Sequence, residues 1–249
     1  MEDIGTAASA TSGTAATPGS AATSGSAVTP GTAASATPKR ARARNRRGEG
    51  GRLREDIVAA AVELLDEAGD ERAITLRSVA RRVGIAAPSI YPHFPDQPAI
   101  MLAVVQREFA ELHDSLRSVV DKAGTEPRQR LYAVCHAYLD FARTHPERYR
   151  TMFGGLWMPD LADSSVTDVD LATLGDASMR ILADALADCA AAGQSTSTDP
   201  AGDAVALWVG LHGLAHQRAV ADAFPWPRDI AGRIIAALAH LDAPGAPDA

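Results

Sequence analysis

The chain is poor in the residues that crosslink a fold, bind a metal or cross a membrane. It has only two cysteines in 249 residues, Cys135 and Cys189, and their spacing matches neither a metal site nor a redox motif. No apolar run approaches the roughly 20 residues that a membrane-spanning helix needs. The start, Met1-Glu2-Asp3, builds no apolar segment of the kind found in export signals. We therefore expect a cytoplasmic protein without membrane contact, whose cysteines are small buried side chains.

Aromatic residues are scarce, at 5% of the chain, whereas alanine is abundant. Little of the sequence alternates β-branched and polar residues as a half-buried strand would. The length allows a sizeable core and one or two domains. The composition therefore predicts an all-α protein.

Positive charge is also in deficit, with a formal net charge of −7, which argues against a nucleic-acid partner if the charge is spread evenly. It is not spread evenly, because basic residues crowd between positions 39 and 54 and Glu49 alone opposes them. The basic residues are Lys39, Arg40, Arg42, Arg44, Arg46, Arg47, Arg52 and Arg54. Residues 1–47, which begin with Ala, Thr, Ser, Gly and Pro, are predicted to be a disordered tail that ends in this basic arm. The arm either contacts DNA phosphates or serves only solubility.

The sequence from Thr75 to Phe94, TLRSVARRVGIAAPSIYPHF, has the pattern of a helix-turn-helix. Thr75 can cap the first helix, whose apolar face is Leu76, Val79, Ala80 and Val83. Gly84 follows at a position where the chain can turn through positive φ. A preceding amphipathic helix, from about Leu53 to Gly69, completes a three-helix headpiece.

The second motif helix carries Pro88 in its first turn and is expected to end near Tyr91, because Pro92 cannot continue it. Ile90 and Phe94 point toward the core. The remaining residues are small or able to hydrogen-bond, which suits a surface laid against base edges and phosphates: Ala86, Ala87, Ser89, Tyr91 and His93. A plain helical hairpin without DNA contact is the structural alternative.

These motifs together resemble the TetR family of transcriptional regulators, from about Arg52 to Phe109. A weaker similarity, WVGLHG at 208–213, resembles the Trp-His-Gly class of C-terminal domains in that family. The resemblance implies a helix-turn-helix domain at 48–96, an effector-binding and dimerisation domain at 97–243 and a frayed tail at 244–249. The fold expected is an all-α headpiece joined to a larger helical bundle.

By resemblance, DNA-contact roles fall on headpiece residues. Arg77 would reach a guanine, whose two acceptors suit a guanidinium. Tyr91 and His93 would bind phosphates, and Gln97 stands where the family commonly has a lysine. The complete set is Thr75, Arg77, Ala86, Ala87, Pro88, Ser89, Tyr91, His93 and Gln97.

The second domain, by resemblance, would bind a small effector inside its helices. An aromatic and methionine-rich lining suits an apolar ligand. The candidates are Tyr138, Met152, Phe153, Trp157, Met158, Met179, Trp208 and His212. Singly, each of these residues is better explained as an ordinary core or dimer-interface residue, and the prediction of a pocket rests on the group.

Further helices are expected at about 97–120, 131–145, 149–153, 169–192, 201–223 and 229–241. By resemblance, those at 169–192 and 201–223 would pair with the same helices of a second copy in a four-helix interface.

The sequence thus predicts a ligand-responsive repressor that binds a pseudo-palindromic DNA operator as a homodimer and is released by a small apolar effector. No catalytic residue, metal or cofactor is expected. Two alternatives stay open. One is a helical metal-dependent enzyme built on His212, His216 and His136, since the first two have i, i+4 spacing. The other is a non-specific DNA-binding protein dominated by its basic arm.

Overall fold

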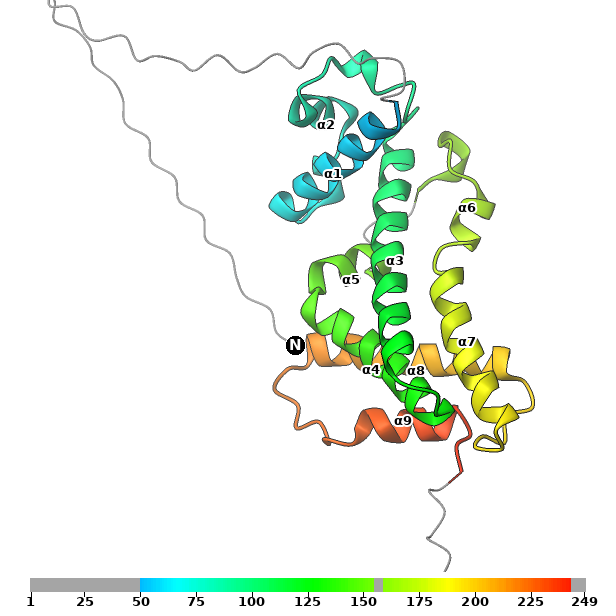
Figure 1. The fold of residues 1–249 in the computed structure, drawn as a ribbon. Coiled ribbons are helices and arrows are strands. Elements are labelled where there is room, and N and C mark those ends of the chain that lie inside the picture. The colour runs from blue at the N-terminus through cyan, green and yellow to red at the C-terminus, as the bar shows by residue number, and fades with distance from the viewer. Residues whose placement is uncertain (1–49, 155–158, 243–249) are drawn as a thin grey trace, which may run out of the picture. The chain divides into compact units, whose positions relative to one another are not determined.

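The computed structural model describes residues 50–154 and 159–242, and these residues form helices with no β-strand (Figure 1). The tail and most of the basic arm, and the frayed end, lie outside these ranges. The α-helices are α1 (Gly50–Ala68), α2 (Leu76–Val83), α3 (Gln97–Lys122), α4 (Pro127–Thr144), α5 (Pro146–Phe153), α6 (Asp168–Ala172), α7 (Asp176–Ala191), α8 (Pro200–Val220) and α9 (Ile230–Leu238). Single 3-10 turns cover Glu71–Ala73, Ala87–Ser89 and Leu161–Asp163. The predicted all-α class is confirmed.

The first motif helix, α2, begins and ends as its sequence predicts. Thr75 Oγ1 accepts from the Ser78 backbone amide at 3.0 Å, and Ser78 Oγ accepts from the Thr75 amide at 2.8 Å. This reciprocal pair satisfies two amides that lack a partner in the first turn. Gly84 ends the helix at φ 80°, a left-handed conformation in which a Cβ is strained. The turn between the two motif helices is therefore fixed at both sides by local chemistry.

The second motif helix is a single 3-10 turn and not an α-helix of several turns. It is the 3-10 turn Ala87–Ser89, with Pro88 in its first turn and a run of turns after it. Pro92 and Pro95 lack an amide hydrogen, so the chain cannot continue a hydrogen-bond ladder through them. Ile90 and Phe94 are nonetheless buried, as predicted. Ala87 is a correction: it is half-buried against the headpiece core instead of facing outward.

One helix, α3, contributes to both hydrophobic cores of the described chain (Figure 1). Its first turns place Ile100, Met101 and Val104 in the headpiece core with residues of α1 and α2. Further along, Leu112 and Leu116 belong to the second core, which α4, α7, α8 and α9 complete. Any displacement of α3 at one core is therefore felt at the other, because packed interiors tolerate little change in volume.

The single helix expected at 169–192 is wrong, because the chain breaks it into α6 and α7. The break falls at Gly175, which has φ 82° and starts α7. A Cβ added to Gly175 would lie 2.8 Å from a ring carbon of Phe109 on α3. The break therefore brings the start of α7 against α3 more closely than any larger residue allows.

This contact predicts a difference between two glycines that share the same backbone conformation. Gly175→Ala should lower the free energy of unfolding by about 2–3 kcal/mol, since it combines a strained φ with the Phe109 clash. Gly193→Ala is the matched control, because its φ is 70° and its Cβ would meet nothing within 4 Å. Urea unfolding of both variants measures this, and we expect about 1 kcal/mol for the control. Equal losses in the free energy of unfolding for the two variants would show that the Phe109 ring moves aside at little cost.

Candidate functional site

The DNA-contact residues predicted from sequence share one exposed region of the headpiece. Thr75, Arg77, Ala86, Pro88, Ser89 and Tyr91 are all exposed, and His93 is half-buried. Tyr91 exposes 58% of its surface although it is a large ring next to the buried Ile90. The α2 cap and the 3-10 turn therefore present an arginine, two hydroxyl residues and a phenol from one short stretch of chain.

Two headpiece side chains are less free than their sequence positions suggest. Gln97 is half-buried, and its amide donates to the Glu71 carbonyl at 3.3 Å, which joins the start of α3 to the first 3-10 turn. Arg82 binds Glu67 and Glu63 of α1, with nitrogen–oxygen distances of 2.5 and 3.1 Å. These acidic partners hold α2 against α1 and neutralise a guanidinium that the sequence alone would count as free for phosphate.

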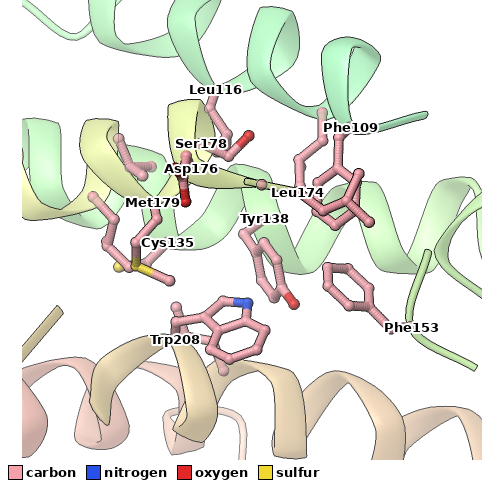
Figure 2. A pocket seen from close by; sticks show the side chains of 15 residues that line it. Phe109, Leu116, Cys135, Tyr138, Phe153, Leu174, Asp176, Ser178, Met179 and Trp208 are labelled. Carbon is pink, nitrogen blue, oxygen red and sulfur yellow. The ribbon is translucent and has the colours of Figure 1, made fainter. Parts of the chain in front are cut away.

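The second core contains a cavity of about 240 Å³ that five helical segments enclose (Figure 2). Helices α3, α4, α7 and α8 supply most of the lining, α5 supplies one ring, and the α6–α7 junction supplies Leu174 and Gly175. The lining is mostly apolar. It consists of Phe109, Leu112, Leu116, Val134, Cys135, Tyr138, Phe153, Leu174, Gly175, Asp176, Ser178, Met179, Leu182, Trp208 and Leu211.

Half of the predicted effector residues line this cavity: Tyr138, Phe153, Met179 and Trp208. Met152 packs against the core without lining the cavity, and His212 lies behind its wall. Trp157 and Met158 fall outside the described residues. The contributions of α3 and the α6–α7 junction were missed. The apolar spacing of Phe109, Leu112 and Leu116 was readable from the sequence, but which helix they face was not.

A hydrogen-bonded cluster supports the cavity wall from behind. The Tyr149 hydroxyl lies 2.6 Å from His212 Nδ1, and the Tyr138 hydroxyl lies 3.0 Å from that of Tyr149 and 3.2 Å from the same nitrogen. Burial, with help from the nearby His216, lowers the pKa of His212 below its ordinary value. The neutral ring can therefore accept at Nδ1, and α4, α5 and α8 are joined through one nitrogen.

This cluster predicts a pH dependence of stability. Because the folded pKa of His212 lies below the unfolded value of 6.5, the unfolded chain binds the extra proton first. The contribution of neutral His212 to the free energy of unfolding is present at neutral pH and is lost as the pH falls from about 6.5 toward the folded pKa. His212→Gln should therefore reduce the stability difference between pH 7.5 and 5.5 by no more than about 1 kcal/mol.

Urea unfolding at the two pH values measures this difference. His136→Gln is the control, because His136 is exposed on α4 and should leave the difference unchanged. A His212 variant with the wild-type pH dependence would contradict the buried, neutral state of this ring.

A buried carboxylate joins α3 to α5 near the headpiece. Glu108 is 3% exposed, and its Oε2 lies 3.5 Å from Arg148 Nε. Burial raises the pKa of Glu108, and the Arg148 charge only partly offsets this. Arg148 directly precedes Tyr149, so one turn of α5 contacts both α3 and the cluster behind the cavity. Sequence reasoning missed this pair, since nothing marks Glu108 as buried.

The metal-site alternative receives no support from geometry. Within 50–154 and 159–242, no three His, Cys, Asp or Glu side chains are grouped so as to hold an ion. His212 uses Nδ1 for the tyrosines. No helix in the same residues is long and apolar enough to span a membrane.

Two family models match the chain, one for each helical core. Residues 57–104 match the bacterial regulatory proteins of the tetR family, and residues 131–241 match the tetracyclin repressor-like C-terminal domain. The description of the second model does not mention the Trp-His-Gly class, so the class expected from 208–213 stays a prediction.

Two characterised relatives are 33% identical over part of the chain. The HTH-type transcriptional activator FasR of Mycolicibacterium smegmatis aligns over 120 residues, 46% of this chain and 53% of that protein. The class A tetracycline repressor protein of transposon 1721, from Escherichia coli, aligns over 97 residues, 36% of this chain and 43% of that protein. The chain thus matches about half of each relative's length or less.

Solved structures share the fold over most of the described chain. A Rhodococcus sp. RHA1 protein of unknown function superposes with a TM-score of 0.60 and 26% identity, covering 78% of this chain and 95% of that one. The fatty acid degradation regulator FadR from Bacillus halodurans has a TM-score of 0.57 at 15% identity, covering 74% and 97%. With matching models for both the helix-turn-helix and the cavity-bearing domain, the chain belongs to the TetR family of transcriptional regulators.

Proposed function

We propose that the protein is a ligand-responsive repressor that binds a pseudo-palindromic operator as a homodimer and leaves it when a small apolar molecule fills the cavity. The observation that carries this proposal is the shared helix α3, which packs in the headpiece core at one end and lines the cavity at the other. Family membership supplies the DNA-binding class, and the cavity supplies a place for an effector.

On DNA, the exposed residues of the turn 86–91, namely Ala86, Pro88, Ser89 and Tyr91, would enter the major groove, with Arg77 beside them. Ala86 and Pro88 offer only apolar contact to base edges, so Arg77 is the main source of direct hydrogen-bond readout. Tyr91 projects from the same turn and would donate to a phosphate. In this division, the phosphate contact of Tyr91 fixes the position of the protein along the DNA, and Arg77 determines the preference for a base.

A second copy would pack against the exposed face of α7 and α8. Val205 and Val209 are 47% and 56% exposed, and they lie one turn apart on α8. Gly213 continues that face one turn later, where a Cβ would meet nothing within 4 Å. An apolar face with a small residue on it suits the close approach of an identical helix about a two-fold axis.

The release mechanism is a shift between two arrangements of α3. A ligand held between Phe109, Leu112 and the α7 start would favour one position of α3, and the Glu108–Arg148 pair ties the same segment to α5. Because α3 also packs in the headpiece core, its displacement changes the spacing of the two headpieces of a dimer. The shift is no larger than the ligand's preference between the two states.

The direct experiment is a mobility-shift assay of the full chain on DNA upstream of its own and neighbouring genes, with random competitor DNA. A specific shift at dimer stoichiometry supports the proposal, and a promoter reporter then fixes the sign of regulation. The reporter matters because one named relative is an activator and the other a repressor. Tight binding to any duplex would favour non-specific binding, and no binding would contradict DNA regulation altogether.

Tyr91 and Arg77 should respond differently to truncation. Tyr91→Phe removes one hydroxyl and should weaken binding by about fivefold on every operator variant, because phosphate carries no sequence information. Arg77→Ala should relax the preference at one base pair by about tenfold or more. Titration of both variants against a set of single-base operator mutants measures this. A base-specific effect of Tyr91→Phe would reverse the two assignments.

Trp208 should matter for the ligand response more than for DNA binding. Trp208→Ala enlarges the cavity and removes a ring from its wall, so a ligand should lose most of its effect on operator affinity. Trp226→Ala is the control, since Trp226 packs on the same core without lining this cavity. Operator affinity with and without ligand measures both variants. Loss of folded dimer in the Trp208 variant alone would assign Trp208 to the core.

A further inference from the structure

The cavity between α3, α4, α7 and α8 has almost no charge on its lining. Among its described lining residues there is no lysine, arginine or histidine, and Asp176 is the single carboxylate. A ligand that carries a carboxylate or phosphate would therefore lose its hydration on entering the cavity and find no cation there to pair with. Burying an unpaired charge in an apolar site is strongly unfavourable.

One polar side chain on the lining has no partner. Ser178 is 8% exposed, and its hydroxyl makes no hydrogen bond although it lines the cavity. Serine inside a helix usually donates back to the carbonyl one turn earlier, so an unpaired hydroxyl here is unusual. The half-buried His113 Nδ1 is also unpaired and lines an adjoining recess that Ser178, Phe109 and Gly175 share. Ser178 is thus a lining residue whose buried hydroxyl has an unused capacity to hydrogen-bond.

Two further polar side chains of the lining, Tyr138 and Cys135, are either already hydrogen-bonded or stay neutral. The Tyr138 hydroxyl bonds to Tyr149 and His212. Burial raises the pKa of the Cys135 thiol to about 12 and raises that of Tyr138 as well, so neither ionises near neutral pH. Cys135 and Tyr138 therefore add no charge to the lining over the physiological range, and the Asp176 carboxylate is the charged group of the described lining.

The size and shape of the space favour a compact aromatic molecule. About 240 Å³ lies below the range of pockets for drug-sized ligands, roughly 300–1,000 Å³. The rings of Phe109, Tyr138, Phe153 and Trp208 come from four different helices and form part of its lining (Figure 2). Aromatic walls favour flat rings that stack or meet them edge-on.

We propose that this cavity binds a neutral, compact aromatic molecule with a single hydroxyl or carbonyl group that hydrogen-bonds Ser178, and that it excludes carboxylates of the same shape. This deepens the proposed function and rests on it for the statement that the occupant is an effector.

The start of α7 is a feature of the cavity that could favour an anionic ligand. Free amides at a helix N-terminus favour an anion, and Gly175 offers no side chain to cap them. Asp176, however, occupies the first position of α7 and places a carboxylate beside those amides. A second carboxylate at this point would be repelled, whereas a neutral oxygen would not.

Three probes with the same ring system separate these possibilities: naphthalene, 2-naphthol and 2-naphthoate, titrated by calorimetry into the full chain at pH 7.5. We expect 2-naphthol to bind about tenfold more tightly than naphthalene, since it adds one hydrogen bond to an otherwise unpaired group. We expect 2-naphthoate to bind at least about tenfold more weakly than 2-naphthol.

Ser178→Ala should abolish the preference for 2-naphthol over naphthalene without reducing thermal stability, because it removes a hydroxyl that has no partner. Ser118→Ala, on α3 and away from the cavity lining, is the matched control and should keep the preference.

Each alternative result has a definite meaning. Tight binding of 2-naphthoate would overturn the proposal and assign an anion to the α7 start. Binding of no probe, or a preference that survives Ser178→Ala, would also overturn it. These outcomes leave the proposed regulator standing if the mobility shift is specific, whereas loss of specific DNA binding alongside normal probe binding would remove only the regulatory role.

Discussion

The structure depends on one constraint: a single helix, α3, is a structural member of two hydrophobic cores. Ile100, Met101 and Val104 hold its first turns in the headpiece, and Leu112 and Leu116 hold its later turns in the second domain. A continuous helix transmits displacement along its axis because its hydrogen-bond ladder resists bending at any single residue. The buried Glu108 sits between these two sets of residues and ties α3 to α5 through Arg148. The cavity and the DNA-contact surface are thus attached to the same rigid element.

Local chemistry explains why the headpiece could be predicted closely from the sequence. Thr75, Ser78 and Gly84 act through contacts with their immediate chain neighbours, so their roles follow from type and spacing. The break at Gly175 could not be predicted in this way, because the apolar spacing of α6 and α7 reads as one helix. The residue that Gly175 packs against is a distant one, Phe109, which lies 66 positions earlier in the chain. Ala87 was misjudged for a related reason, since a 3-10 turn presents a different face from an α-helix.

The cavity shows the same division between local and distant information. Residue type identified Tyr138, Phe153, Met179 and Trp208 as candidates, and all four line it. His212 is one turn from Trp208 but serves the cavity indirectly, through hydrogen bonds with Tyr138 and Tyr149. Ser178, the proposed hydrogen-bond partner of the ligand, could not be identified from the sequence, because whether a hydroxyl lacks a partner depends on the residues packed around it. The sequence pattern thus indicates which domain contains the cavity. Only the packing of the folded chain shows which side-chain atoms have no hydrogen-bond partner there.

The measurement that tests the central claim most directly is thermodynamic reciprocity between cavity and operator. The affinity of 2-naphthol would be measured for the free protein and for the operator complex, and operator affinity would be measured with and without 2-naphthol. Linkage requires the two ratios to agree, and a shared α3 predicts that both fall by the same factor of about 5–150. Equal 2-naphthol affinity for free and DNA-bound protein would show that α3 does not couple the two cores.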